Sequence, residues 1–146
     1  MARIHREFRY ETDATDVTTP VLEAFAARRG VCQDFAHIMT GCLRALGLAA
    51  RYVSGYLLTV PPAGATSLLG ADASHAWLSV WCPRASADAT WLDLDPTNNV
   101  IPSNAHVTLA IGRDFGDVSP LRGILRGGGE HKLAVGVTVR RAKLSA

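Results

Sequence analysis

Apolar positions in the segment 32–46 recur with the period of an α-helix. They stand at i, i+3, i+4, i+7 and i+11, at Phe35, Ile38, Met39, Cys42 and Leu46. This spacing puts them on one face of an amphipathic helix that begins near Cys32. Gly47 follows as a C′ glycine, which commonly ends a helix in the left-handed conformation. The pattern predicts a helix that buries this face, with Cys42 packed in the core.

A shorter helix is predicted just before this one. Thr19 is a suitable N-cap, and Pro20 suits the first helical position because it lacks a backbone N–H that would need a partner. The helix is expected to run to about Arg29, with Gly30 as its C-terminal stop. Residues 1–18 are polar and mixed, and the only apolar alternation among them lies around Phe8 and Tyr10.

After Gly47 the pattern changes to the alternation of β-strands. Strands are predicted over residues 50–60, 74–82, 91–94, 106–111 and 132–140, with Pro- and Gly-containing loops over 61–73 and 83–89. In the strand 74–82, one face carries His75, Trp77, Ser79 and Trp81. Because the helices precede the strands, we expect an α+β fold with an antiparallel sheet.

The 146 residues correspond to one domain with enough chain for a core. Net charge is +2, and the only local basic cluster, Arg140, Arg141 and Lys143, has no aromatic residues interleaved with it, so a nucleic-acid partner is not predicted. No apolar run approaches the roughly 20 residues of a membrane span, and the first residues lack the apolar region of a signal peptide. The odd count of three cysteines favours a reducing compartment, so a cytoplasmic location is expected.

Three residues have positions suited to thiol chemistry. Cys32 stands at the start of the predicted helix, His75 opens a strand, and Asp95 ends the next strand. A helix N-terminus favours the thiolate and offers N–H groups to an oxyanion. A histidine can take the thiol proton, and a carboxylate can hold the imidazole in the right tautomer.

Four segments also resemble the bacterial transglutaminase-like superfamily, whose members are commonly described as candidate cysteine proteases. They are GVCQDFAH (30–37), AARYVSGY (49–56), SHAW (74–77) and WLDLDPT (91–97), and GRDFGD (112–117) and RGGGE (126–130) resemble later parts of the family. We therefore expect residues 1–146 to form a single catalytic domain with its core motifs between 19 and 130. The β-rich region that usually precedes this core in the family is not expected in these residues.

The resemblance implies a papain-like fold in which Cys32 is the nucleophile, His75 the base and Asp95 the orienting carboxylate. It also implies that Trp77 and Trp91 help to wall the site. Asp34 is expected to support the site, since its carboxylate can accept backbone N–H groups at the helix N-terminus.

Several residues compete for these roles. Asp93 lies on the same strand face as Asp95, but the Trp-x-x-Leu-Asp pattern favours Asp95. His37 lies about 140° around the helix from Cys32, so we expect it to bond a neighbouring element instead. Cys82 is expected to be structural, and His5, His106 and His131 have no partner spacing. Metal-ligand, phosphate-loop and calcium-loop spacings are missing, so no metal or cofactor is predicted.

The sequence thus predicts a cysteine-dependent acyl-transfer enzyme that acts on peptide or carboxamide bonds of a peptide or protein substrate. Hydrolysis through a thioester is favoured, and transamidation of protein glutamine is the alternative. A binding module that keeps the fold without catalysis is a second class of function, and a metal-dependent hydrolase is a third.

Overall fold

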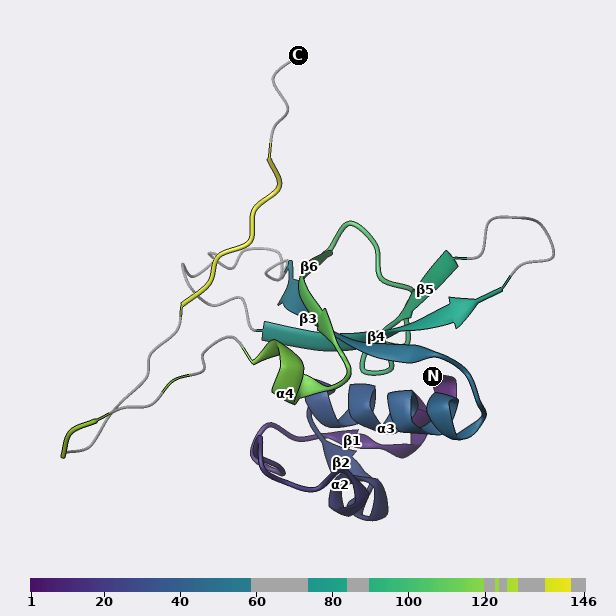
Figure 1. The fold of residues 1–146 in the computed structure, drawn as a ribbon, viewed down its shortest axis with the longest axis horizontal. Helices are drawn as coiled ribbons and strands as arrows, with labels where there is room; N and C mark the ends of the chain where they lie inside the picture. The colour runs from purple at the N-terminus through teal and green to yellow at the C-terminus, as the bar shows by residue number, and fades with distance from the viewer. Residues whose placement is uncertain (59–73, 84–89, 120–122, 124–125, 129–135, 143–146) are drawn as a thin grey trace, which may run out of the picture.

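A long helix, α3 (Cys32–Ala45), lies across one face of a four-stranded antiparallel sheet (Figure 1). The computed structural model describes residues 1–58, 74–83, 90–119, 123, 126–128 and 136–142. The sheet has the order β5-β4-β3-β6, formed by β3 (Ala50–Leu57), β4 (Ser74–Cys82), β5 (Thr90–Leu94) and β6 (His106–Gly112). The predicted α+β class with an antiparallel sheet is confirmed.

The apolar face of α3 forms the main core with the central strand β4. Phe35, Ile38 and Met39 are buried against Leu78. At the C-terminal end, Gly47 has φ 78°, and the N–H groups of Gly47 and Leu48 bond the carbonyls of Arg44 (2.9 Å) and Leu43 (3.0 Å). These two bonds form a Schellman motif, in which glycine takes the left-handed position.

The prediction for Cys42 is wrong, because its side chain is exposed. From Gly41 to the end of α3 no residue is buried, and Leu46 is 76% exposed. The periodic pattern correctly identifies one helix face, but only the first half of that face is covered by the sheet.

The N-terminal segment forms a small layer on the other side of α3 (Figure 1). It contains α1 (Ala2–Glu7), α2 (Val21–Ala27) and a two-stranded parallel pair, β1 (Arg9–Tyr10) with β2 (Arg29–Gly30). The pattern did not predict α1, since a helix of six residues with Ile4 alone buried carries no periodic signal. The predicted stop at Gly30 is also wrong: α2 ends at Ala27, its C-cap Arg28 adopts φ 51°, and Gly30 belongs to β2.

Strand β4 lies between β5 and β3, and its residues 75–80, whose side chains alternate between the two faces of the sheet, are all buried. Its predicted bounds are confirmed. The predicted loops lie mostly outside the described residues, as does the first part of the predicted strand 132–140. Within residues 136–142 the structure has only an isolated bridge at Val137. Among the described residues, no helix has the length and apolar character needed to span a bilayer.

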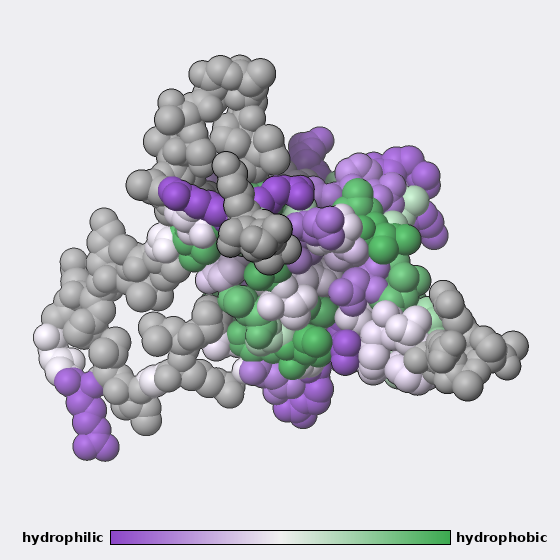
Figure 2. Space-filling view, turned by 90° about the horizontal axis from the view of Figure 1, so that it is seen from above, coloured by the Kyte–Doolittle hydropathy of each residue, from purple (hydrophilic) through white to green (hydrophobic). Residues whose placement is uncertain are grey.

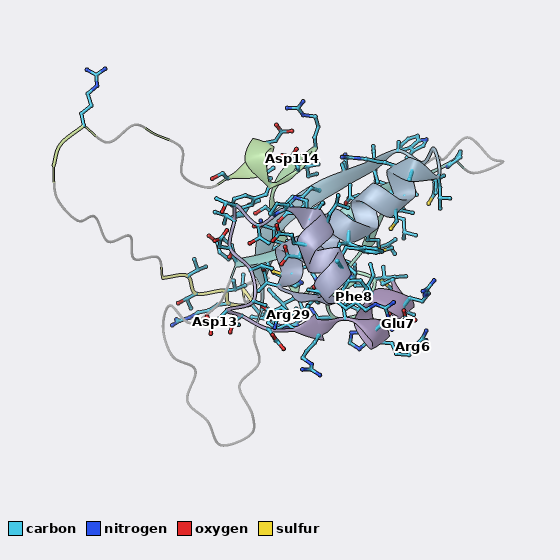
Figure 3. All side chains as sticks on the ribbon, turned by 90° about the horizontal axis from the view of Figure 1, so that it is seen from below. Arg6, Glu7, Phe8, Asp13, Arg29 and Asp114 are labelled. Carbon is cyan, nitrogen blue, oxygen red and sulfur yellow. The ribbon has the colours of Figure 1, made fainter. Side chains whose placement is uncertain are left out.

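The surface carries both apolar and charged areas. Hydrophobic side chains gather in patches on the upper face of the molecule (Figure 2), and edge strand β6 exposes Val107, Leu109 and Ile111. On the opposite, lower face, Figure 3 shows Arg6, Glu7 and Arg29 in the N-terminal layer.

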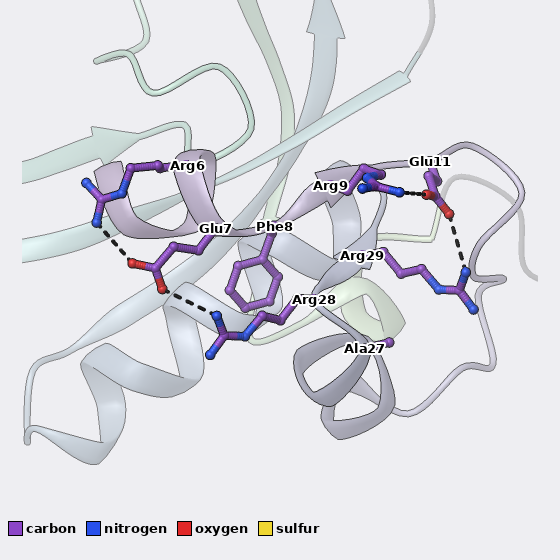
Figure 4. Close-up of a pocket in the computed structure, with 8 residues that line it drawn as sticks. All are labelled: Arg6, Glu7, Phe8, Arg9, Glu11, Ala27, Arg28 and Arg29. Carbon is purple, nitrogen blue, oxygen red and sulfur yellow. Dashed lines mark hydrogen bonds and ion pairs between the residues drawn. The ribbon is translucent and has the colours of Figure 1, made fainter.

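A surface pocket of about 730 Å³ lies in the N-terminal layer (Figure 4). Glu7 pairs with Arg6 at 3.0 Å and with Arg28 at 3.8 Å, and Glu11 pairs with Arg9 and Arg29, both at 3.6 Å. Exposed ion pairs of this kind contribute little to stability. None of the predicted site residues lines this pocket.

Candidate active site

Cys32 is the first residue of α3, and the preceding chain holds it in place. Strands β1 and β2 pair through N–H···O bonds from Arg9 to Arg28 (2.8 Å) and from Glu11 to Gly30 (3.0 Å). Val31 then adopts an extended conformation as the N-cap. The first N–H groups of a helix have no intrahelical acceptor. The thiol of Cys32 therefore lies at a helix end with N–H groups free to bind a ligand.

Asp34 stabilises this helix start. Its buried carboxylate accepts the N–H of Val31 at 2.8 Å and the hydroxyl of Thr15 at 2.6 Å. Valine has no acceptor in its side chain, so Asp34 supplies the side-chain hydrogen bond at this terminus. Gly30 is required for this packing, because a Cβ there would lie 2.5 Å from Asp34 Oδ2. The structure therefore places Asp34 where the sequence predicted it.

His75 and Asp95 meet directly. The Nε2 of His75 donates to Asp95 Oδ2 at 2.8 Å, and the Asp95 side chain is fully buried. Asp95 follows β5 and forms an isolated bridge with Val100, which closes the turn 96–99. Asp93 instead accepts the hydroxyl of Ser79 on β4. Of the two aspartates considered from the sequence, the structure brings Asp95 to the histidine.

The charges of Cys32, His75 and Asp95 are coupled. Burial of His75 acts against its imidazolium form, but hydrogen bonds to Asp95 and Cys32 outweigh it and raise the pKa of His75 to about 9. Burial also opposes ionisation of Asp95, yet the hydrogen bonds from His75, Asn98 and His106 hold its pKa well below the usual range. Because Nε2 of His75 is bonded to Asp95, its Nδ1 is the ring nitrogen left for Cys32. The three side chains form a series of thiol, imidazole and carboxylate.

Two further residues, which the sequence analysis missed, bind the same carboxylate. Asn98 Nδ2 donates to Asp95 Oδ2 at 2.8 Å, and His106 Nε2 donates to it at 3.0 Å. The other oxygen, Oδ1, accepts the N–H groups of Thr97 (3.0 Å) and Asn98 (3.1 Å). Aspartate before Pro-Thr-Asn is a typical start of an Asx turn, which could have pointed to Asn98. No local signal links His106 to Asp95, eleven residues earlier.

His75, Asp95 and His106 together could hold a metal ion, since one ligand atom from each lies within 4.8 Å of the others. Two imidazoles and one carboxylate are a donor set that suits transition metals. In this structure both imidazoles already bond one oxygen, Oδ2 of Asp95, and the amide of Asn98 binds the same oxygen. The arrangement therefore satisfies its polar groups as a hydrogen-bonded cluster.

The two tryptophans predicted to line the site differ in position. Trp77 is fully buried and stacks on His75 with ring centroids 6.0 Å apart. Trp91 packs against Trp81, at 5.4 Å, with the guanidinium of Arg51 3.9 Å above its ring. Trp81 and Trp91 are register partners, and Trp81 lies six positions along β4 from His75, about 20 Å of strand. The structure brings Trp77 to the site as a support behind His75, and it does not bring Trp91 there.

His37 does not join the cluster. Its Nε2 accepts the N–H of Phe115 at 3.1 Å, at the start of α4 (Phe115–Val118), and its ring lies 4.7 Å from that of Tyr52. Burial lowers the pKa of His37, although Asp114 and Asp34 partly oppose this. Burial and the nearby Cys32 raise the pKa of Tyr52. His37 thus bonds a neighbouring element, as predicted, and Tyr52 forms part of the surroundings of Cys32.

Comparison with known proteins establishes the family of this chain. The family model of the transglutaminase-like superfamily matches residues 1–96, which include Cys32, His75 and Asp95. The chain belongs to the transglutaminase-like superfamily. The segments 112–117 and 126–130, which also resemble the family, lie outside that match.

Relatives and a solved structure agree with this assignment. A protein of Mycobacterium tuberculosis is 48% identical over 132 residues, which cover 90% of this chain and 42% of that protein. A protein-glutamine gamma-glutamyltransferase of Pseudomonas aeruginosa is 34% identical over 110 residues, covering 70% of this chain and 16% of the enzyme. The crystal structure of a protein from Cytophaga hutchinsonii, proposed to be a cysteine protease, matches with a TM-score of 0.62 and 29% identity, covering 80% of this chain and 35% of that one. The chain thus spans less than half the length of each of these proteins.

Proposed function

We propose that this domain catalyses cysteine-dependent acyl transfer from a peptide or carboxamide carbonyl, with Cys32 as nucleophile, His75 as general base and acid, and Asp95 as the orienting carboxylate. The observation that carries the proposal is the 2.8 Å bond from His75 Nε2 to the buried Asp95, in a histidine whose pKa is also raised by Cys32 at the start of α3. Proteins use this order of groups to activate a nucleophile.

The chemistry follows from these positions. His75 takes the thiol proton, and Sγ of Cys32 forms a bond to the carbonyl carbon, which gives a tetrahedral oxyanion. The free N–H groups at the start of α3 stabilise that charge. The C–N bond then breaks, and His75 gives its proton to the departing amine or ammonia. A thioester on Cys32 is left, which an acceptor must resolve.

The acceptor decides between hydrolysis and transamidation. Water gives a carboxylic acid, and a primary amine gives a new amide; either restores the thiol of Cys32. We favour hydrolysis, in line with the protease proposed for the Cytophaga hutchinsonii protein. The similarity to the Pseudomonas aeruginosa gamma-glutamyltransferase supports transamidation as the second candidate.

A pair of assays separates these reactions. Glutamine-containing peptides are incubated with the protein, with or without a fluorescent primary amine, and ammonia release and amine incorporation are measured. New peptide termini are followed by mass spectrometry. Hydrolysis predicts new termini or ammonia without the amine, and transamidation predicts a fluorescent peptide.

Iodoacetamide labelling tests the site without a substrate. Cys32 is expected to be alkylated faster than Cys42 or Cys82 at pH 6–7, because His75 can take the proton of its thiol. The variant Cys32→Ala is expected to lose all turnover and keep its melting temperature, whereas Cys42→Ala, at the exposed end of the same helix, keeps full activity. Equal labelling of the three cysteines would contradict catalysis and favour a binding module.

A further inference from the structure

His106 contacts the proposed catalytic carboxylate directly, although neither the resemblance to the family nor the sequence pattern assigns it a role. It is the first residue of β6 and pairs in register with Leu57 of β3. Two residues earlier on β3, Gly55 is the register partner of His75. The two histidines therefore lie on β4 and β6, the strands that flank β3, and both reach Asp95.

The close approach of β6 and the Trp77 ring to β3 requires a glycine at position 55. A Cβ at this position would lie 2.5 Å from the Trp77 ring and would also collide with the carbonyl oxygen of Val107. Trp77 passes over the glycine and meets both imidazoles: it stacks on His75 and contacts His106 edge to face, with centroids 5.2 Å apart at 84°. Packing thus fixes the His106 ring.

Among the described residues, only one nitrogen of the His106 ring makes a hydrogen bond. Its side chain is 6% exposed, and Nε2 donates to Asp95 Oδ2 at 3.0 Å. Its Nδ1 is buried and has no hydrogen-bond partner among the described residues. A buried N–H without an acceptor is costly, so this arrangement favours the tautomer with the proton on Nε2. The ring of His106 therefore donates its hydrogen bond to Asp95 Oδ2, the oxygen that also accepts the hydrogen bond of His75.

We propose that His106 is a positioning residue of the triad: it shares Asp95 Oδ2 with His75, which fixes that oxygen and limits how strongly Asp95 holds the His75 proton. This inference rests on the proposed function. Hydrogen bonds to one carboxylate oxygen divide its negative charge, so each additional donor weakens the hold on the others. A general acid must release its proton to the leaving group, and it works best when that proton is not held too tightly.

The titration of His75 reports this directly. The titratable groups that face it are Cys32 of α3, Asp95 after β5 and His106 of β6, and Tyr52 of β3 lies next to Cys32. Imidazole NMR titrations are compared for the wild-type protein, His106→Leu, His106→Gln and His5→Ala, all in EDTA. Leucine removes the donor, while glutamine keeps an N–H at a similar reach. His5 is the matched control, since its Nδ1 contacts the carbonyl of Thr97 in the same turn (2.8 Å) without touching Asp95.

We expect the His75 midpoint to rise by about 0.5–1 pH unit in His106→Leu, and to stay within about 0.2 unit of wild type in His106→Gln and His5→Ala. An unchanged or lower midpoint in folded His106→Leu overturns the proposal, as does an equal rise in His106→Gln. Wild-type spectra give an independent result that requires no variant to fold: a His106 proton on Nδ1 rather than Nε2 also overturns it.

The proposed function and the proposed role of His106 can be refuted independently of each other. If wild-type Cys32 is alkylated no faster than Cys42 and Cys82, the proposed function is wrong. If Cys32 is highly reactive but His75 titrates identically in His106→Leu and wild type, only the role of His106 is wrong.

Discussion

Replacing Asp95 by asparagine changes one atom of the buried carboxylate and reverses its hydrogen bonding. Oδ1 accepts the N–H groups of Thr97 and Asn98, so the amide oxygen of the new residue must take that position. The amide nitrogen then stands where Oδ2 accepted His75, Asn98 and His106. An NH₂ group cannot accept these bonds, so three donors lose their acceptor.

The catalytic consequence follows from the tautomer. Facing an NH₂ group, His75 Nε2 becomes an acceptor, and the ring proton moves to Nδ1, the nitrogen left for Cys32. A protonated Nδ1 cannot take the thiol proton. We expect Asp95→Asn to lower kcat by about 10³–10⁴-fold, the cost of the wrong tautomer in hydrolases with the same order of groups.

The stability cost has a defined pH window. Leaving one partner of a buried pair alone costs about 3–5 kcal/mol. The pKa of His75 is raised from 6.5 to about 9, which corresponds to roughly 3 kcal/mol of stability. Because that pKa is raised on folding, the contribution is complete below pH 6.5 and is lost as the pH rises through 9. Because the pKa of Asp95 is lowered, its contribution is lost as the pH falls below its ordinary value of 3.8.

Urea unfolding at pH 6 and pH 10 measures this difference. Asp95→Asn should be less stable than wild type by about 3–5 kcal/mol at pH 6. Because Asp95 and Cys32 together raise the pKa of His75, the gap should shrink at pH 10 by the share that comes from Asp95. Asp93→Asn is the matched control, since an amide oxygen can still accept the Ser79 hydroxyl, and it should change neither stability nor alkylation of Cys32. A gap that does not depend on pH, or a variant with wild-type turnover, would refute the assigned coupling.

Three other substitutions test the surrounding structure. Asp34→Ala removes the acceptor at the start of α3 and should cost about 2 kcal/mol in urea unfolding, with slower alkylation of Cys32. Gly55→Ala forces a Cβ against Trp77 and should lower stability by about 1–3 kcal/mol, with a changed near-UV circular dichroism spectrum. Leu78→Ala opens a cavity under α3 and should cost about 2–5 kcal/mol without altering the pH dependence of alkylation. A stable Leu78→Ala would show that this core contact is not essential.

Much of the fold can be predicted from local patterns. The apolar period and the terminal glycine defined α3, and alternation defined β4 with its observed bounds. Helix α1 was missed because a six-residue helix with one buried residue gives no period. Cys42 was assigned to the core because a periodic stripe shows which face is apolar, and not how far the neighbouring sheet extends along it.

The candidate site was predicted only in part. Cys32, His75 and Asp95 came from residue types at element ends and from the family resemblance, and the structure brings them together. Asn98 and His106 were missed, and His106 reaches Asp95 only because β6 pairs with the far side of β3.

Local sequence is enough to define the helices, the strands and the chemical groups at their ends, because helix and strand periods, caps and turns depend on residues a few positions apart. Which side chains share a carboxylate oxygen depends on how the strands pair in the folded sheet. Strand register determines these contacts. Gly55 pairs with His75, Leu57 pairs with His106, and Trp91 pairs with Trp81 at the other end of β4. Register depends on the packing of the whole sheet against α3, which no local stretch of sequence contains.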